Sequence, residues 1–214
     1  MKTRAILSFS TFSRYTTDMA SQPRMRMTYE EYAEGEKTTL YRNEYFRGEV
    51  FPMCSGTGDH AQIGANVMSA LHQELRRRGC RLLAGNMRFH IAAVGLHTYC
   101  DGIVVRGECE FFRDDHYVLA NPTLLIEVVS PDSEAFDRGR KAEFYRIIPS
   151  LAHYLLIAED RLSVELFTRL DDKTWQLNTG THITDALYFS AFETSLSVAE
   201  IYRGIDLPPA RLHK

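Results

Sequence analysis

The sequence contains no apolar run that approaches the roughly 18 residues needed to cross a membrane. It also lacks an excess of positive charge, because 25 Lys and Arg stand against 28 Asp and Glu, a formal net charge of -3. Proteins that bind nucleic acid through their whole surface are typically strongly basic. The charge balance therefore excludes a uniformly basic nucleic-acid binder and leaves room only for a local basic groove.

Cysteine and histidine motifs are also missing. The four cysteines, Cys54, Cys80, Cys100 and Cys109, form no C-x-x-C pair, and none has a histidine at zinc-finger spacing. No H-x-H or H-x-D pair is present, although a metal-dependent hydrolase of small phosphoesters would need such ligands. We therefore expect reduced thiols in a cytoplasmic protein.

A chain of 214 residues is long enough for one domain with a sizeable core. We expect an N-terminal extension over residues 1–26, a folded domain over 27–207 and a short tail over 208–214. The extension is rich in Ser and Thr and carries five basic residues against one acid. A loosely attached extension is favoured over a targeting peptide, which remains the alternative.

The hydrophobic pattern predicts an α/β fold. A capping box at 28–31 opens a short helix, and Asp59 is the expected N-cap of a long helix over 59–78. Residues 43–53 predict a hairpin with its turn at 47–48. Strands, a second helix over 133–148, a β-meander and a C-terminal helix after Ser197 complete a mixed central sheet with helices on both faces.

Glu127 is the most informative residue, because it lies within the apolar segment 124–129. That segment predicts a strand buried on both faces, where an ionised carboxylate is costly unless it is paired or binds a metal. Asp101, directly before another apolar strand, is the natural partner. Two carboxylates on adjacent strands would suit Mg²⁺. The structural alternatives are that Asp101 is an ordinary turn residue, and that Glu127 is paired with a buried arginine or points to a solvated edge of the sheet.

Lys141 can be placed by geometry. From Glu127 to the strand end the chain advances about 10 Å, and the helix returns about the same distance to Lys141 if it packs antiparallel. Glu44 could supply a third carboxylate, and His60 a phosphate contact at a helix N-terminus. For these three residues the structural alternatives are a solvated lysine, a surface strand residue and a capping or packing histidine.

Five segments carry a resemblance to a known family: NEYFRGEV, DHAQI, YCDGIVV, LLIEVVSPDSEAFDRGRKAEFY and IPSLAHYLLI. Together they resemble the Uma-two family of endonucleases in the PD-(D/E)XK superfamily. The resemblance covers about residues 28–207 and is most specific in the long central block. One departure is Cys100, where the family normally has proline.

The resemblance implies a restriction endonuclease-like core with an added β-meander. The family's acids fall on Glu44, Asp101 and Glu127, and its lysine has moved to Lys141. Asp101, Glu127 and the carbonyl of Val128 would hold Mg²⁺, with Mn²⁺ as a substitute, and Lys141 would orient the attacking water.

The implied substrate is nucleic acid, with DNA favoured, and the implied assembly is a homodimer. Arg138 and Arg140 are expected to be exposed and to contact phosphates, whereas Arg76–Arg78 fit a solvated helix end. The alternative function is a non-catalytic, DNA-associated binding module with the same fold.

Overall fold

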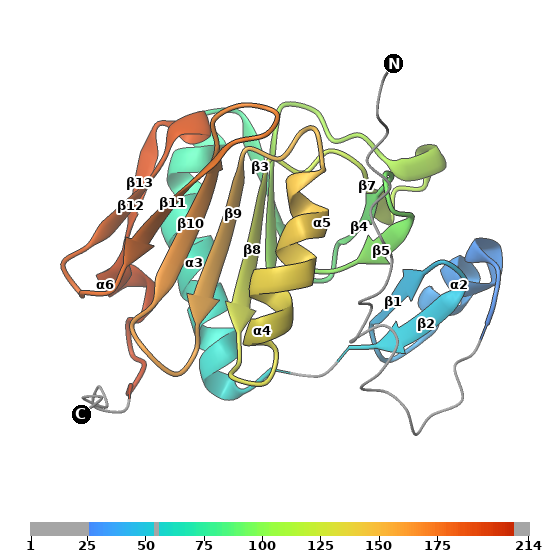
Figure 1. Cartoon of the computed structure of the whole chain (residues 1–214), viewed down its shortest axis with the longest axis horizontal. Helices are drawn as coiled ribbons and strands as arrows, with labels where there is room; N and C mark the ends of the chain where they lie inside the picture. The colour runs from blue at the N-terminus through green and yellow to red at the C-terminus, as the bar shows by residue number, and fades with distance from the viewer. Residues whose placement is uncertain (1–25, 54–55, 208–214) are drawn as a thin grey trace, which may run out of the picture.

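The computed structural model describes residues 26–53 and 56–207, and Figure 1 shows how the elements are arranged. The expected extension and tail, together with Cys54, lie outside these ranges apart from Arg26. Arg26 forms an isolated β-bridge with Glu49 and therefore belongs to the fold.

A six-stranded mixed sheet forms the centre of the protein, in the order β11-β10-β9-β8-β6-β3. β8 and β9 run parallel, and the other neighbouring pairs run antiparallel. The predicted meander is confirmed, since β9, β10 and β11 pair in sequence order. The bounds are β3 (Cys80–Ala84), β6 (Gly102–Arg106), β8 (Leu124–Val129), β9 (His153–Ala158), β10 (Val164–Arg169) and β11 (Trp175–Gly180).

Strand β8 is buried along its whole length because helices cover both faces of the sheet. In Figure 1, α3 (Gly58–Arg77) lies behind the sheet, and α4 (Glu134–Phe136) and α5 (Ala142–Arg146) lie in front of it. Alternate side chains of a strand point to opposite faces. Ile126 accordingly packs in the core that contains α3, and Leu125 packs in the core that contains α5.

A second, five-stranded sheet, in the order β2-β1-β5-β4-β7, lies beside the first, where the sequence had predicted one sheet. Its predicted hairpin is confirmed, with Arg47 and Gly48 at φ values of 50° and 88° in the turn. Helix α2 (Tyr29–Glu36) begins with the expected capping box. The strands are β1 (Asn43–Phe46), β2 (Glu49–Pro52), β4 (Arg88–Ile91), β5 (Leu96–Thr98) and β7 (Val118–Leu119).

The C-terminal part of the described chain closes the α3 face of the main sheet. β12 (Ala186–Phe189) and β13 (Thr194–Ser197) form a two-stranded sheet, and α6 (Val198–Ile201) follows. The Ser197 side chain caps α6 as predicted, by accepting a hydrogen bond from the Glu200 N–H. Two 3-10 turns, η1 (Phe112–Asp114) and η3 (Ser190–Phe192), complete the fold.

Two local predictions were wrong. The N-cap of α3 is Thr57, whose hydroxyl accepts a hydrogen bond from the His60 N–H, so Asp59 lies inside the first turn. The expected continuous helix over 133–148 is interrupted by a π-helical segment, η2 (Asp137–Lys141), between α4 and α5. Such π segments are rare and occur frequently at functional sites.

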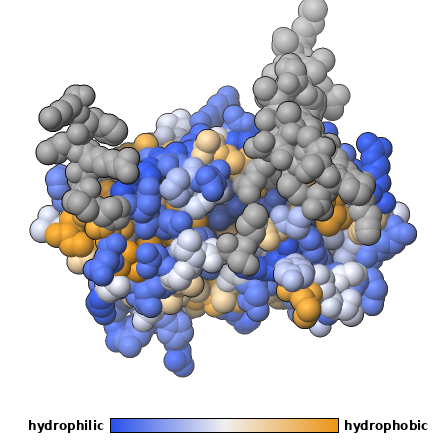
Figure 2. Space-filling view, turned by 90° about the horizontal axis from the view of Figure 1, so that it is seen from below, coloured by the Kyte–Doolittle hydropathy of each residue, from blue (hydrophilic) through white to orange (hydrophobic). Residues whose placement is uncertain are grey.

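The surface is largely polar. Seen from below, hydrophobic side chains form several separate patches on a mostly hydrophilic face (Figure 2). Among the helices of the described ranges, none has the length and apolar character of a transmembrane segment.

Candidate active site

Glu127 lies at the middle of β8 on the face covered by α5, and only 5% of it is exposed. Its Oε1 atom accepts a hydrogen bond from the Tyr145 hydroxyl at 2.7 Å. The same oxygen lies 2.7 Å from the Lys141 Nζ. The buried carboxylate is therefore compensated by one cation and one neutral donor.

Burial raises the pKa of Glu127 to about 8, because the ionised form loses its hydration. The positive charge of Lys141 opposes this shift, and the negative charges of Asp137 and Asp101 add to it. Glu127 is therefore mostly protonated at neutral pH until a further cation approaches it.

Lys141 is buried, contrary to the solvated alternative, and belongs to the π-helical segment η2. Its Nζ lies 3.4 Å from the Asp137 Oδ1, in addition to its contact with Glu127. The predicted position level with Glu127 is confirmed, although the helix is not regular. Neighbouring carboxylates raise the pKa of Lys141 well above its usual value, against the effect of burial, so the lysine stays charged.

Asp101 stands directly before β6, where it meets the middle of β8. Extending the β6–β8 register by one pair places Asp101 opposite Glu127, and the Asp101 N–H donates to the Ile126 carbonyl at 2.9 Å. Its Oδ2 accepts a hydrogen bond from the Val128 N–H at 2.7 Å. The Asp101 carboxylate therefore replaces a backbone acceptor at the point where β6 begins.

His60 holds the other oxygen of Asp101. Its Nε2 lies 2.9 Å from the Asp101 Oδ1, and its Nδ1 lies 3.7 Å from the Glu159 Oε2. The hydrogen bond with Asp101 raises the pKa of His60, against the effect of burial. The Thr57 hydroxyl also donates to Glu159, so the start of α3 is tied to the end of β9. His60 lies between two carboxylates, an arrangement that the phosphate-contact hypothesis did not anticipate.

Glu44 brings the second sheet to the same place. It is buried on β1 and accepts a hydrogen bond from the Thr98 hydroxyl on β5. Its negative charge contributes to the raised pKa of Lys141, so the two groups interact electrostatically. All four residues predicted as catalytic thus gather where the two sheets meet.

The site's chemistry fits Mg²⁺, which prefers oxygen ligands and is often held by one or two carboxylates together with substrate phosphates. One buried oxygen, the Asp137 Oδ1, has no hydrogen-bond partner beyond its ion pair with Lys141. Within residues 26–53 and 56–207, however, no three or more His, Cys, Asp or Glu residues form a ready metal cluster. A metal would therefore need oxygens from the substrate or solvent as well.

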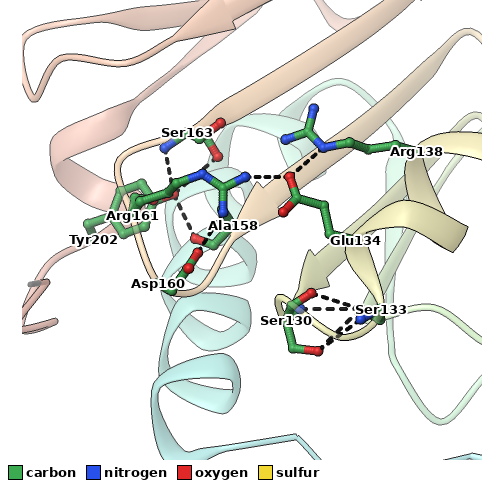
Figure 3. A network of polar contacts seen from close by, with 9 residues as sticks. All are labelled: Ser130, Ser133, Glu134, Arg138, Ala158, Asp160, Arg161, Ser163 and Tyr202. Carbon is green, nitrogen blue, oxygen red and sulfur yellow. Dashed lines mark hydrogen bonds and ion pairs between the residues drawn. The ribbon is translucent and has the colours of Figure 1, made fainter. Parts of the chain in front are cut away.

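Arg138 and Arg140 are less exposed than predicted, with side-chain exposures of 30% and 26%. Figure 3 shows Arg138 paired with Glu134, which also pairs with Arg161 on the β9–β10 turn. Arg138 also pairs with Glu165 on β10. The expectation of two exposed arginines was wrong. Arg138 packs against the β9–β10 hairpin, and Arg140 pairs with Glu143 three residues further along the chain.

The same figure shows how this turn is anchored. The Tyr202 hydroxyl contacts the Ala158 and Arg161 carbonyls, each at 2.8 Å, and accepts a hydrogen bond from the Ser163 N–H (Figure 3). A continuous set of contacts therefore runs from the end of α6 through the turn to the segment that carries Lys141.

Sequence reasoning gave no role to Asp137 and Tyr145. Their spacing of four residues on either side of Lys141 was the available signal. It missed Thr98 and Glu159 altogether, since each reaches the site only through strand pairing and packing.

Comparisons with known proteins identify the family of the chain. Residues 28–199 match the Uma2 family model, described as "Putative restriction endonuclease". Two relatives from Synechocystis sp. are named uncharacterized proteins sll1609 and slr1290. The first is 30% identical over 71% of this chain and 85% of its own length, and the second is 29% identical over 86% and 96%.

A solved structure shares the fold. It is a crystal structure titled as a putative nuclease belonging to DUF820 from Anabaena variabilis. The TM-score is 0.62 at 17% identity, and the match covers 77% of this chain and 91% of the other. The restriction endonuclease-like character of the core is consistent with this neighbour.

Proposed function

Because this chain belongs to the Uma2 family, described as "Putative restriction endonuclease", we propose that it is a metal-dependent endonuclease that hydrolyses nucleic-acid phosphodiester bonds, with DNA as the favoured substrate. The observation that carries the proposal is the buried pair of Glu127 and Lys141 beside Asp101. A fold with no such chemistry would gain little from burying these charges, since a buried ion pair is often no more stable than apolar residues.

The proposed metal ligands are Asp101, Glu127 and the carbonyl of Val128. In a strand, the N–H and C=O of one residue point to the same edge, and the Val128 N–H already meets Asp101. Mg²⁺, or Mn²⁺ in its place, would supply Lewis acidity toward the phosphodiester.

The remaining roles belong to the side chains around Glu127. Lys141 orients the attacking water and stabilises charge on the phosphate, because its ammonium is held within the site rather than in solvent. Glu44 is the third acid of the site. His60 holds the Asp101 carboxylate in place, and Arg140 remains the helix cation proposed for phosphate contact. A homodimer would supply a second site for the opposite strand.

The test is cleavage of duplex and single-stranded DNA with Mg²⁺, with Mn²⁺ and with EDTA. Glu127→Gln is the matched control, since it keeps the shape and removes the charge. Metal-dependent cleavage that disappears in the Glu127→Gln variant supports the proposal. Cleavage that is equal in wild type and variant would show a contaminating nuclease.

The alternative, a non-catalytic DNA-associated module, has one observation in its favour. Both Asp101 oxygens and the Glu127 Oε1 already have protein partners. DNA binding without cleavage at any tested metal concentration would favour this alternative.

A further inference from the structure

Two large apolar side chains are exposed immediately before β1. Leu40 is 93% exposed and Tyr41 is 71% exposed. They lie in the loop that joins α2 to β1, which we call the rim loop (residues 37–42). Single exposed apolar residues are common, but two in succession beside a proposed active site form a candidate contact surface.

Hydrogen bonds hold the backbone of the rim loop in place. The Asn43 side chain donates to the Tyr41 carbonyl at 3.1 Å and to the Glu36 carboxylate at 2.7 Å. The Tyr41 N–H donates to the Thr39 hydroxyl at 3.3 Å. The Tyr99 hydroxyl donates to the same Glu36 carboxylate. The exposed side chains are therefore presented by a fixed backbone, which lowers the entropy that a partner must overcome.

Arg42 ties the rim loop to the acidic site. The Arg42 carbonyl accepts from the Met53 N–H and so extends the β1–β2 ladder, which puts Arg42 on the same face as Glu44. Its Nη1 donates to the Gly85 carbonyl at 2.5 Å. Gly85 packs on the backbone of Asp101, since an added Cβ would lie 3.1 Å from the Asp101 carbonyl oxygen.

The excess of acidic groups in the site makes the position of the Arg42 guanidinium important for binding phosphate. The site gathers four carboxylates around one lysine, so an approaching phosphate meets an excess of acidic groups over basic ones. Arg138 is paired with carboxylates, as shown above. Arg42 is exposed and bonds to a neutral carbonyl, so that contact leaves its charge unneutralised.

We propose that the rim loop is a nucleic-acid contact of this site: Arg42 binds a backbone phosphate next to the cleaved bond, and Tyr41, flanked by Leu40, packs against a nucleotide base. Arginine suits phosphate, and an aromatic ring can stack on any base. The contact would be independent of sequence. This inference rests on the proposed function, because it assumes that nucleic acid enters the site.

The experiment measures binding of a fluorescent DNA duplex and of the same single strand. Binding is followed by anisotropy at several salt concentrations with Mg²⁺, using full-length Glu127→Gln protein to prevent cleavage. Arg42→Ala and Tyr41→Ala are added to this background. The matched controls are Arg77→Ala, at the far end of α3, and Tyr188→Ala on β12, at the opposite end of the molecule from β1 in Figure 1.

Arg42→Ala should weaken binding about tenfold and reduce the magnitude of the salt slope by about one. Tyr41→Ala should weaken binding by about five- to tenfold with an unchanged salt slope. Both controls should bind within twofold of the parent. Thermal melting checks that the variants remain folded, and Arg42→Lys should restore most of the salt dependence if charge is what matters.

Separate outcomes overturn the two proposals. If the parent binds DNA and the rim-loop variants bind equally well, the inference is wrong while the proposed function stands. If wild type neither cleaves nor binds any nucleic acid, the proposed function fails and the inference falls with it.

Discussion

The Lys141 Nζ lies 2.7 Å from the Glu127 Oε1, although the two residues are on different elements and 14 positions apart. Two residues after Glu127, the strand carries Val129, which is buried in the core shared with α5. The π-helical segment carries the lysine back to the middle of β8. The positive charge beside Glu127 thus comes from a helical segment packed on the sheet, while the strand itself carries the apolar side chain of Val129.

Breaking this pair on one side should destabilise the protein strongly. At pH 9, where Glu127 is ionised, Lys141→Met leaves the buried carboxylate without its cation, at a cost of about 3–5 kcal/mol in the free energy of unfolding. The double variant Lys141→Met with Glu127→Gln should recover much of that loss, because neither charge remains. Urea denaturation of wild type, both single variants and the double variant measures the coupling. Additive single effects would mean that the two groups do not interact.

The raised pKa of Glu127 predicts how stability depends on pH without metal. The side chain titrates near 4.5 when unfolded and at about 8 when folded. Between these values the unfolded state has lost a proton that the folded state retains, so the free energy of unfolding falls as pH rises. Urea denaturation in EDTA at pH 5.5, 7 and 8.5 tests this. Glu127→Gln should show a shallower decline, and identical slopes would contradict the prediction.

Mg²⁺ binding should have the opposite pH dependence. Because the metal needs ionised Glu127, binding must displace a proton below pH 8, and affinity should fall by up to about tenfold for each pH unit below that value. Calorimetry at pH 6.5, 7.5 and 8.5 gives the dissociation constants, with Asp101→Asn as a control that removes a proposed ligand. A constant affinity across this range would argue against Glu127 as a ligand.

Replacing Arg138 and replacing Arg140 should have different effects on stability and on DNA binding. Arg138→Ala breaks pairs with Glu134 and Glu165, so it should lower stability by about 1–2 kcal/mol and slow cleavage by displacing Lys141, without changing the salt slope of DNA binding. Arg140→Ala should instead reduce that slope. Denaturation and anisotropy measured on the same two variants separate the roles. An unchanged slope in both would show that DNA does not pass this helix.

Removing the Tyr202 hydroxyl should affect the stability of the protein but not its rate of DNA cleavage. Tyr202→Phe removes its contacts with the β9–β10 turn and should cost about 1–2 kcal/mol of stability. The rate of DNA cleavage at saturating substrate should stay within about twofold of wild type at 25 °C, because the turn holds no proposed catalytic group. A large loss of rate with normal stability would mean that this anchor reaches the active site.

The sequence by itself determined most of the helices and strands, and it identified the acidic residue inside an apolar strand. Periodic apolar residues predicted α3, and the apolar run around Glu127 predicted a strand buried on both faces with one acid inside it. These are local signals, because side-chain spacing follows directly from helix and strand geometry. The position of Lys141 could also be predicted, since the strand and the returning segment have known rises per residue.

Only the tertiary structure decided what each side chain meets. The split into two sheets, the π-helical turn and the carboxylates that occupy Arg138 depend on contacts between residues far apart in the chain. The hydrogen bond between Thr98 and Glu44 is of the same kind. A sequence pattern fixes which face of an element is apolar, but not which neighbour covers it. For that reason the acids and Lys141 could be named in advance, whereas the other partners of the acids could not.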